Sequence, residues 1–197
     1  MTIKPSGTSG FTWIEALVAL AISGILIAVI ISKVTNMLAL DQMSSTISNM
    51  KQLHLATYAM VMDGQTNKDT NLGWPGDKGG TFSNWTKQLL SDYLGTNDLR
   101  KLLSAPGKIV PPGEISTMQD SAVLAYAVST NSQNLTVFLT TANFTNTPTG
   151  GLPLLPTAKP YGNKGFVVFS KAGEGAVLQP KQVGMTNLIG TYGPLLR

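Results

Sequence analysis

The stretch that decides the fold runs from Gly10 to Ile31 and reads GFTWIEALVALAISGILIAVII. From Phe11 to Ile31 it contains 21 residues, and Glu15 is its only ionisable side chain. A helix of 21 residues spans roughly 30 Å, which matches the hydrocarbon thickness of a bilayer. We therefore predict that residues 11–32 form the membrane-spanning first half of a long N-terminal helix.

The first ten residues of the chain read MTIKPSGTSG and are polar. Pro5 and two glycines prevent them from starting a stable helix, so residues 1–10 are predicted to be a leader peptide. Lys4 and Lys33 bracket the apolar stretch, so the charge bias that sets orientation is weak. Because short tails usually stay in the cytoplasm, we expect the leader to be cytoplasmic and the rest of the chain extracytoplasmic.

The same stretch has two other interpretations, an ordinary signal peptide and a plain signal anchor. An ordinary signal peptide has a shorter apolar region that is cut after it, whereas the small residues Ala19-Leu20-Ala21 lie inside the apolar run. That alternative fits poorly. A plain signal anchor agrees with the hydropathy of the stretch, so hydropathy alone does not exclude this interpretation.

Glu15 distinguishes this stretch from a plain anchor. A charged side chain near the membrane interior costs on the order of 2.5–3.5 kcal/mol on insertion scales, so such groups usually have a partner. Lys33 is eighteen residues away, too far along the helix to reach it. Cleavage between Gly10 and Phe11 would create a free α-amine, and the amine of a neighbouring copy could then pair with Glu15. The sequence thus predicts a partner from another molecule.

The run Gly10-Phe11-Thr12-Trp13-Ile14-Glu15, followed by apolar residues, resembles the prepilin cleavage and methylation signature of type IV pilins and type II secretion pseudopilins. The resemblance implies that a prepilin peptidase cuts after Gly10 and that the new N-terminal Phe11 is N-methylated. It also implies that Glu15 is needed for recruitment into the filament by an inner-membrane assembly platform. Members of the family more often have Leu at the position of Trp13 and a bulky aliphatic at that of Ala16.

The helix is predicted to continue beyond the membrane as an amphipathic half over residues 33–63. Its apolar residues keep the spacing of one helical face, and Asp63-Gly64 is the expected C-terminal stop. His54 lies within this half and is the only histidine in the chain. Because no second His or Cys exists to complete a site, we expect His54 to be a packing or surface residue.

Residues 64–197 are predicted to form a globular head. A helical insertion is expected at about residues 84–103, with Ser83 or Asn84 as its cap. An antiparallel sheet is expected at about residues 122–180, and the tail from Val183 to Arg197 is left irregular. The expected strands are Ala122–Ser129, Leu135–Thr141, Gly165–Ser170 and Ala176–Gln179, the first two joined as a hairpin. The resulting fold class is α+β and pilin-like, a long helix packed on a small antiparallel sheet.

The composition excludes several functions. The chain has no cysteine and a net charge of +4, and its basic residues are scattered, so thiol chemistry and nucleic-acid binding are not expected. No catalytic motif is present, and we expect neither an enzyme nor a cofactor or metal site. Asp63, Asp69 and Asp77 could be read as calcium ligands. Without EF-hand spacing, solvated loop acids are the better interpretation.

The predicted function is therefore structural. The chain is expected to be a single-pass protein of the bacterial inner membrane that later enters a homo- or heteropolymer with other pilin-like subunits. An extended pilus, a type II secretion pseudopilus and a DNA-uptake fibre all fit. The alternative is a membrane-anchored extracytoplasmic binding module that does not polymerise, which leaves Glu15 unexplained.

Overall fold

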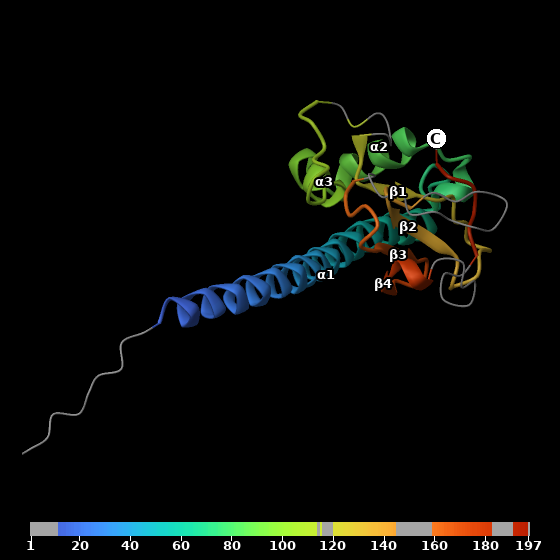
Figure 1. Ribbon diagram of the computed structural model, residues 1–197. Coiled ribbons are helices and arrows are strands. Elements are labelled where there is room, and N and C mark those ends of the chain that lie inside the picture. Colours follow the sequence, from blue (N-terminus) through green and yellow to red (C-terminus); the bar gives the residue numbers. More distant parts are fainter. Residues whose placement is uncertain (1–11, 114, 116–119, 145–158, 183–190, 197) are drawn as a thin grey trace, which may run out of the picture. The chain divides into compact units, whose positions relative to one another are not determined.

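A computed structural model describes residues 12–113, 115, 120–144, 159–182 and 191–196 of the chain. These residues form one long helix, two short α-helices and a four-stranded sheet (Figure 1). The chain divides into two compact units, with the boundary between Leu38 and Ala39. The first unit contains the N-terminal part of helix α1, and the second contains the remainder of α1 and the rest of the fold.

Helix α1 spans Trp13–Asn67, so the predicted stop at Asp63-Gly64 is wrong. The left-handed residue that follows the helix is Lys68, with φ of 56°. Gly64 has a different purpose. A Cβ at this position would lie 2.7 Å from the carbonyl oxygen of Leu72, so the glycine allows the following turn to approach the helix closely.

The sheet is antiparallel throughout and has the order β1-β2-β3-β4, with β1 at Val123–Ala125, β2 at Val137–Thr141, β3 at Phe166–Ser170 and β4 at Gly175–Leu178. The predicted hairpin of the first two strands is confirmed by the pairing of Val123 with Thr141. The first strand is shorter than predicted because the chain leaves β2 after Tyr126. The N–H of Ala127 donates instead to the carbonyl of Pro194, at 2.7 Å.

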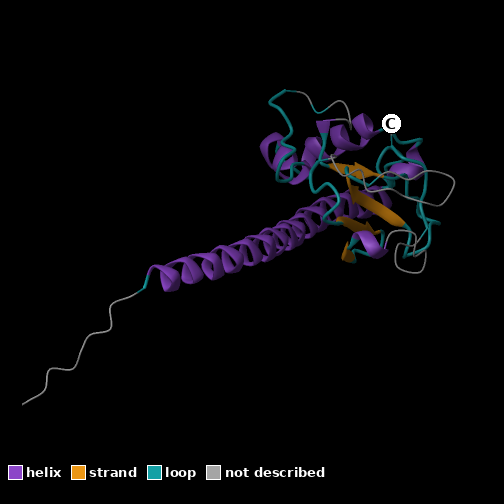
Figure 2. Cartoon of the chain, viewed as in Figure 1, coloured by secondary structure: helices purple, strands orange, loops and turns teal. Residues whose placement is uncertain are grey.

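Apolar side chains on both faces of the sheet are buried. Figure 2 shows the strands beside the C-terminal part of α1. Val167 and Phe169 of β3 belong to the main core, which also contains the inward side chains of α1 from Ala39 onward. Phe166 and Val168 alternate with them and belong to a second apolar cluster. This alternation follows from the two-residue period of a strand. The long helix packed on this small antiparallel sheet is the α+β, pilin-like arrangement expected from the sequence.

Two short helices lie between α1 and the sheet in the sequence, α2 at Phe82–Asp92 and α3 at Thr96–Leu103. The N-cap of α2 is Thr81, whose side chain accepts a hydrogen bond from the N–H of Asn84, so the predicted cap at Ser83 or Asn84 is wrong. The cap lies earlier because Phe82 is already helical and buried. Short 3-10 helices occur at Pro75–Lys78 and Pro180–Gln182.

The described part of the C-terminal tail, residues 191–196, forms hydrogen bonds to the chain where β1 ends. Leu195 forms an isolated antiparallel bridge with Tyr126, and the N–H of Leu196 donates to the carbonyl of Ala125 at 2.9 Å. Tyr192 packs against Tyr126 with their ring centroids 5.3 Å apart. This segment therefore pairs with the end of β1 and, through a bridge between Tyr192 and Val137, with the start of β2. Residues 183–190 and 197 of the predicted irregular tail lie outside the described residues.

Candidate assembly site

The N-terminal end of α1 is closed by a reciprocal pair of side chains. The Glu15 carboxylate oxygen Oε2 accepts hydrogen bonds from the backbone N–H of Thr12, at 2.8 Å, and from the Thr12 hydroxyl, at 2.9 Å. The N–H of Glu15 donates to the Thr12 hydroxyl oxygen at 3.3 Å. This arrangement is a capping box, with Thr12 as N-cap and Glu15 three residues later. Gly10 and Phe11, the other predicted site residues, lie outside the described residues.

Glu15 therefore has partners inside its own chain, but these partners are uncharged. Thr12 was not predicted as a partner of Glu15, although the signature Thr-x-x-Glu before an apolar run predicts a capping box. Among the described residues, no basic side chain forms an ion pair with Glu15. The capping box satisfies one carboxylate oxygen and leaves the predicted pairing with an amine of another copy untested.

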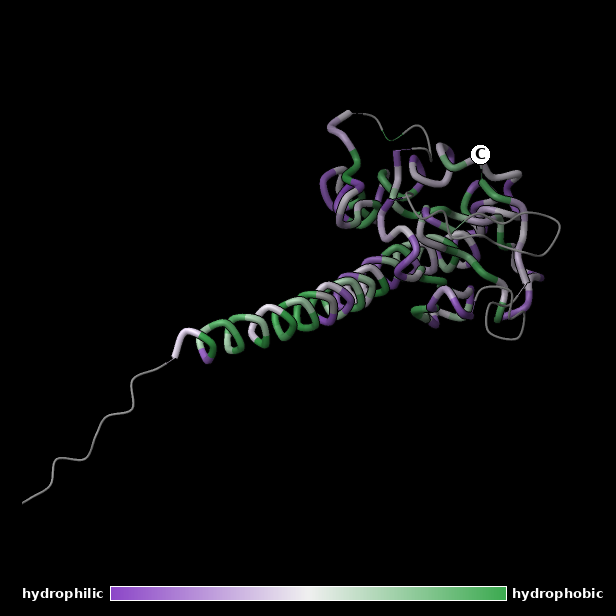
Figure 3. The backbone as a smooth tube through the Cα atoms, in the orientation of Figure 1, coloured by the Kyte–Doolittle hydropathy of each residue, from purple (hydrophilic) through white to green (hydrophobic). Residues whose placement is uncertain are grey.

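The surface of α1 in the first unit is apolar almost throughout (Figure 3). Its large hydrophobic side chains between Trp13 and Leu38 are 45–79% exposed. By length and composition, the helix can cross a membrane. One apolar helix of this kind could anchor the chain in a bilayer.

From Ala39 onward, α1 buries one face in the core of the second unit. Met43, Met50 and Leu53 are fully buried, at the spacing of a single helical face. Two buried hydrogen bonds between side chains are among those that fasten this face to distant parts of the chain. The Tyr161 hydroxyl contacts the Thr46 hydroxyl at 2.5 Å, and the Trp85 indole N–H donates to the Thr57 hydroxyl at 3.1 Å. The second half of α1 is thus an integral part of the head.

His54 is buried and packs in the core. Of the two expected roles, packing residue or surface residue, the first is therefore confirmed. Its Nε2 lies 2.8 Å from the carbonyl oxygen of Lys171, and its ring is 5.6 Å from that of Phe169 and 5.9 Å from that of Trp74. Burial lowers the pKa of His54, and the hydrogen bond to Lys171 opposes this shift. The neighbours are mainly aromatic, which suits a neutral imidazole.

The three acids considered as calcium ligands make separate contacts. Asp63 accepts a hydrogen bond from the Tyr93 hydroxyl at 2.8 Å, and Asp69 accepts one from the N–H of Asn71 at 2.9 Å. Asp77 accepts hydrogen bonds from Thr130. Within the described parts of the chain, no group of three or more His, Asp or Glu side chains could hold a metal ion. Each acid therefore stabilises its own turn or loop contact.

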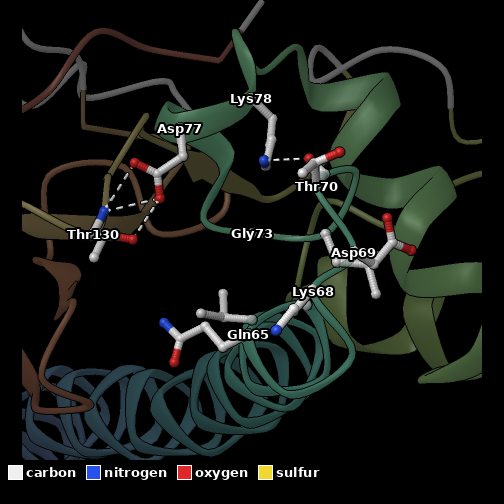
Figure 4. Close-up of a pocket in the computed structure, with 11 residues that line it drawn as sticks. Gln65, Lys68, Asp69, Thr70, Gly73, Asp77, Lys78 and Thr130 are labelled. Carbon is white, nitrogen blue, oxygen red and sulfur yellow. Dashed lines mark hydrogen bonds between the residues drawn. The ribbon is translucent and has the colours of Figure 1, made fainter.

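A cavity of about 420 Å³ lies at the C-terminal end of α1 (Figure 4). Gln65 enters it from the helix, and the 3-10 helix contributes Asp77 and Lys78. The Asp77 carboxylate is held by the N–H and hydroxyl of Thr130, at 2.9 and 2.8 Å, and the Lys78 ammonium donates to the carbonyl of Thr70. Much of the polar lining is therefore engaged in internal hydrogen bonds.

Taken together, a long helix with an apolar first half, a capped carboxylate at its start and an antiparallel sheet that shares a core with its second half define a pilin-like α+β protein. Two curated relatives are similar to the chain, and both are named type IV major fimbrial protein FimA, from Dichelobacter nodosus. One is 38% identical over 65 residues, 33% of this chain and 42% of the relative. The other is 37% identical over 67 residues, 34% of this chain and 43% of the relative.

The chain thus spans less than half the length of these two relatives. No family model matches the chain, and no solved structure matches it significantly. The similarity supports the type IV pilin family, and neither relative's name describes an enzyme. This agrees with the expectation that the protein is structural.

Proposed function

We propose that the chain is a structural subunit of a type IV pilus or a type II secretion pseudopilus. In this proposal a prepilin peptidase cuts between Gly10 and Phe11, Phe11 is N-methylated, and the processed chain polymerises through its N-terminal helix. The subunit waits in the bacterial inner membrane with its head extracytoplasmic. An assembly platform then moves it into a homo- or heteropolymer of pilin-like subunits.

The observation that carries the proposal is the exposed apolar first half of α1 with a carboxylate at its first turn. An apolar surface of this extent needs lipid or other helices around it. Glu15 has uncharged partners in its own chain and can still accept a cation. The α-amine released at Phe11 of a neighbouring copy would supply that cation and would place the two helices side by side.

The experiment that tests processing is mass spectrometry of the full chain recovered from membranes and from sheared filaments of a host with the assembly machinery. We expect a mature chain that begins with methylated Phe11. Gly10→Leu should leave the leader attached, whereas the matched control Gly7→Leu, three residues earlier in the leader, should be processed normally. An intact Met1 in the filament fraction would contradict the proposal.

A second variant tests assembly. Glu15→Ala should be inserted in the membrane and processed, yet be absent from the filament fraction. Thr66→Ala, at an exposed polar position of the same helix within the head, is the control and should assemble normally. Incorporation of Glu15→Ala at the level of the unmodified chain would count against the pairing of Glu15 with a neighbour's amine.

The cavity beside Gln65 and Lys78 favours a second candidate, a membrane-anchored binding module that does not polymerise. Its volume of about 420 Å³ lies within the usual range of small-molecule sites. Under this candidate the chain would stay in the membrane fraction with its leader attached. The mass measurement described above distinguishes the two candidates.

A further inference from the structure

The capping box engages the two oxygens of the Glu15 carboxylate unequally. Both hydrogen bonds from Thr12 end on Oε2, at 2.8 and 2.9 Å. Among the described residues, none donates a hydrogen bond to Oε1. The carboxylate is therefore held by one oxygen, while the other can accept a further hydrogen bond.

The Thr12 hydroxyl has two roles in this arrangement. It donates to Glu15 Oε2 and accepts from the backbone N–H of Glu15, as a hydroxyl group can do simultaneously. The side chain of Thr12 thus ties the Glu15 carboxylate to the first turn and selects one rotamer of a flexible residue. A valine at position 12 would have nearly the same shape and could make neither contact.

We propose that Thr12 is a positioning residue for assembly: it holds Glu15 Oε2 against the first turn of α1 and leaves Oε1 to accept the cation of a neighbouring copy. This inference rests on the proposed function, because it specifies how the assembly carboxylate is presented. The N–H of Thr12 is a peptide amide both before and after cleavage between Gly10 and Phe11. The same hydrogen bonds are therefore available to the precursor and to the processed subunit.

The arrangement has a consequence for the order of events. Before a neighbour arrives, the carboxylate already has two donors and lies at the positive end of the helix dipole, so a part of its cost in the membrane is offset and the rest is left for a cation to relieve. When a neighbour arrives, the carboxylate does not need to be reoriented. Pairing then loses less side-chain entropy than it would from a freely rotating Glu.

The test compares Thr12→Val, Thr12→Ser and Glu15→Gln in the full chain. For each variant, the fraction of processed subunit that enters filaments is measured, so that altered cleavage near residue 10 is not counted as altered assembly. Thr12→Val should reduce incorporation about tenfold, as expected for losing one hydrogen bond to a charged group. Thr12→Ser keeps the hydroxyl and should restore it.

A second measurement separates positioning from simple helix stability. Amide hydrogen exchange of the Glu15 N–H, in detergent micelles, should be faster in Thr12→Val than in the unmodified chain. In Glu15→Gln the amide can still complete a capping box, so the exchange of residue 15 should stay slow while incorporation is lost. This combination of results would show that capping depends on the Thr12 hydroxyl and that pairing with the cation depends on the charge of Glu15.

The failures can be told apart. If Thr12→Val enters filaments as well as the unmodified chain while Glu15→Ala does not, Thr12 is not a positioning residue and the proposed function stands. If Thr12→Ser is as defective as Thr12→Val, the hydroxyl is not the group that matters and the inference is overturned. If Glu15→Ala also assembles normally, the proposed function itself fails.

Discussion

Leu53→Ala tests whether the buried face of α1 is the one that fastens the helix to the head. Leu53 is 0% exposed and belongs to the main core cluster, so its truncation leaves a cavity in addition to the lost burial. Substitutions of this kind cost 2–5 kcal/mol, and we expect about 3 kcal/mol here. For a head of this size, that corresponds to a fall in Tm of roughly 6–12 °C.

The matched control is Leu55→Ala, two residues further along the same helix. Leu55 is 55% exposed, so the same chemical change should alter the free energy of unfolding by no more than about 0.5 kcal/mol. Thermal unfolding of the full chain in detergent micelles is followed by the fluorescence of the buried Trp74 and Trp85, in a Trp13→Phe background. If Leu55→Ala lowers Tm as much as Leu53→Ala, the assigned core face of α1 is wrong.

Three further substitutions test contacts between distant parts of the head. Because burial lowers the pKa of His54, the unfolded chain binds a proton below pH about 6.5 before the folded chain does. The free energy of unfolding should therefore fall as pH drops below about 6.5, and His54→Gln should flatten this dependence in denaturation curves recorded between pH 5 and 8. Tyr161→Phe removes the hydroxyl bonded to Thr46 and should cost about 1–2 kcal/mol in thermal unfolding. Gly173→Ala should cost about 1–3 kcal/mol by the same measurement, because φ at this residue is 90° and the new Cβ would lie 3.2 Å from the His54 ring; an unchanged Tm would contradict that geometry.

The parts of the fold that could be predicted are those with a strong local pattern. The apolar run after Phe11 and the regular spacing of apolar residues beyond Leu40 predict one long helix, and the β-rich runs around Asn131 predict a hairpin. The end of that helix was predicted wrongly. A glycine after an aspartate is typical of a C-cap, but Gly64 is required by the close approach of Leu72. The sequence does not reveal which of these two reasons applies, because Leu72 approaches only after the chain has folded.

The contacts of the candidate site and of His54 likewise include some that a local sequence pattern could reveal and some that it could not. Glu15 could be singled out because a lone acid in an apolar run is costly, and its partner Thr12 could have been found because the capping-box signature is local. The partner of His54 could not be predicted. Lys171 is 117 residues further along the chain, and it reaches the histidine only through the turn after β3. The assembly role of Glu15 and the cleavage after Gly10 stay predictions.

A comparison of magnitudes explains why one carboxylate could control assembly. In the described part of the first unit, fifteen large apolar side chains between Trp13 and Leu38 are exposed, and removing them from water would release on the order of tens of kcal/mol. In the membrane, however, lipid already surrounds these side chains, so transfer from lipid into a filament changes their free energy little. A charged side chain differs, because its cost in a bilayer is about 2.5–3.5 kcal/mol and a cation can relieve it. An equilibrium shifts only by the difference between its two states, and in the proposed filament Glu15 would be the side chain of this segment for which lipid and filament differ most. Under the proposed function, the apolar surface would therefore drive the helix out of water, and the carboxylate would drive it out of lipid to a place beside a second, processed copy.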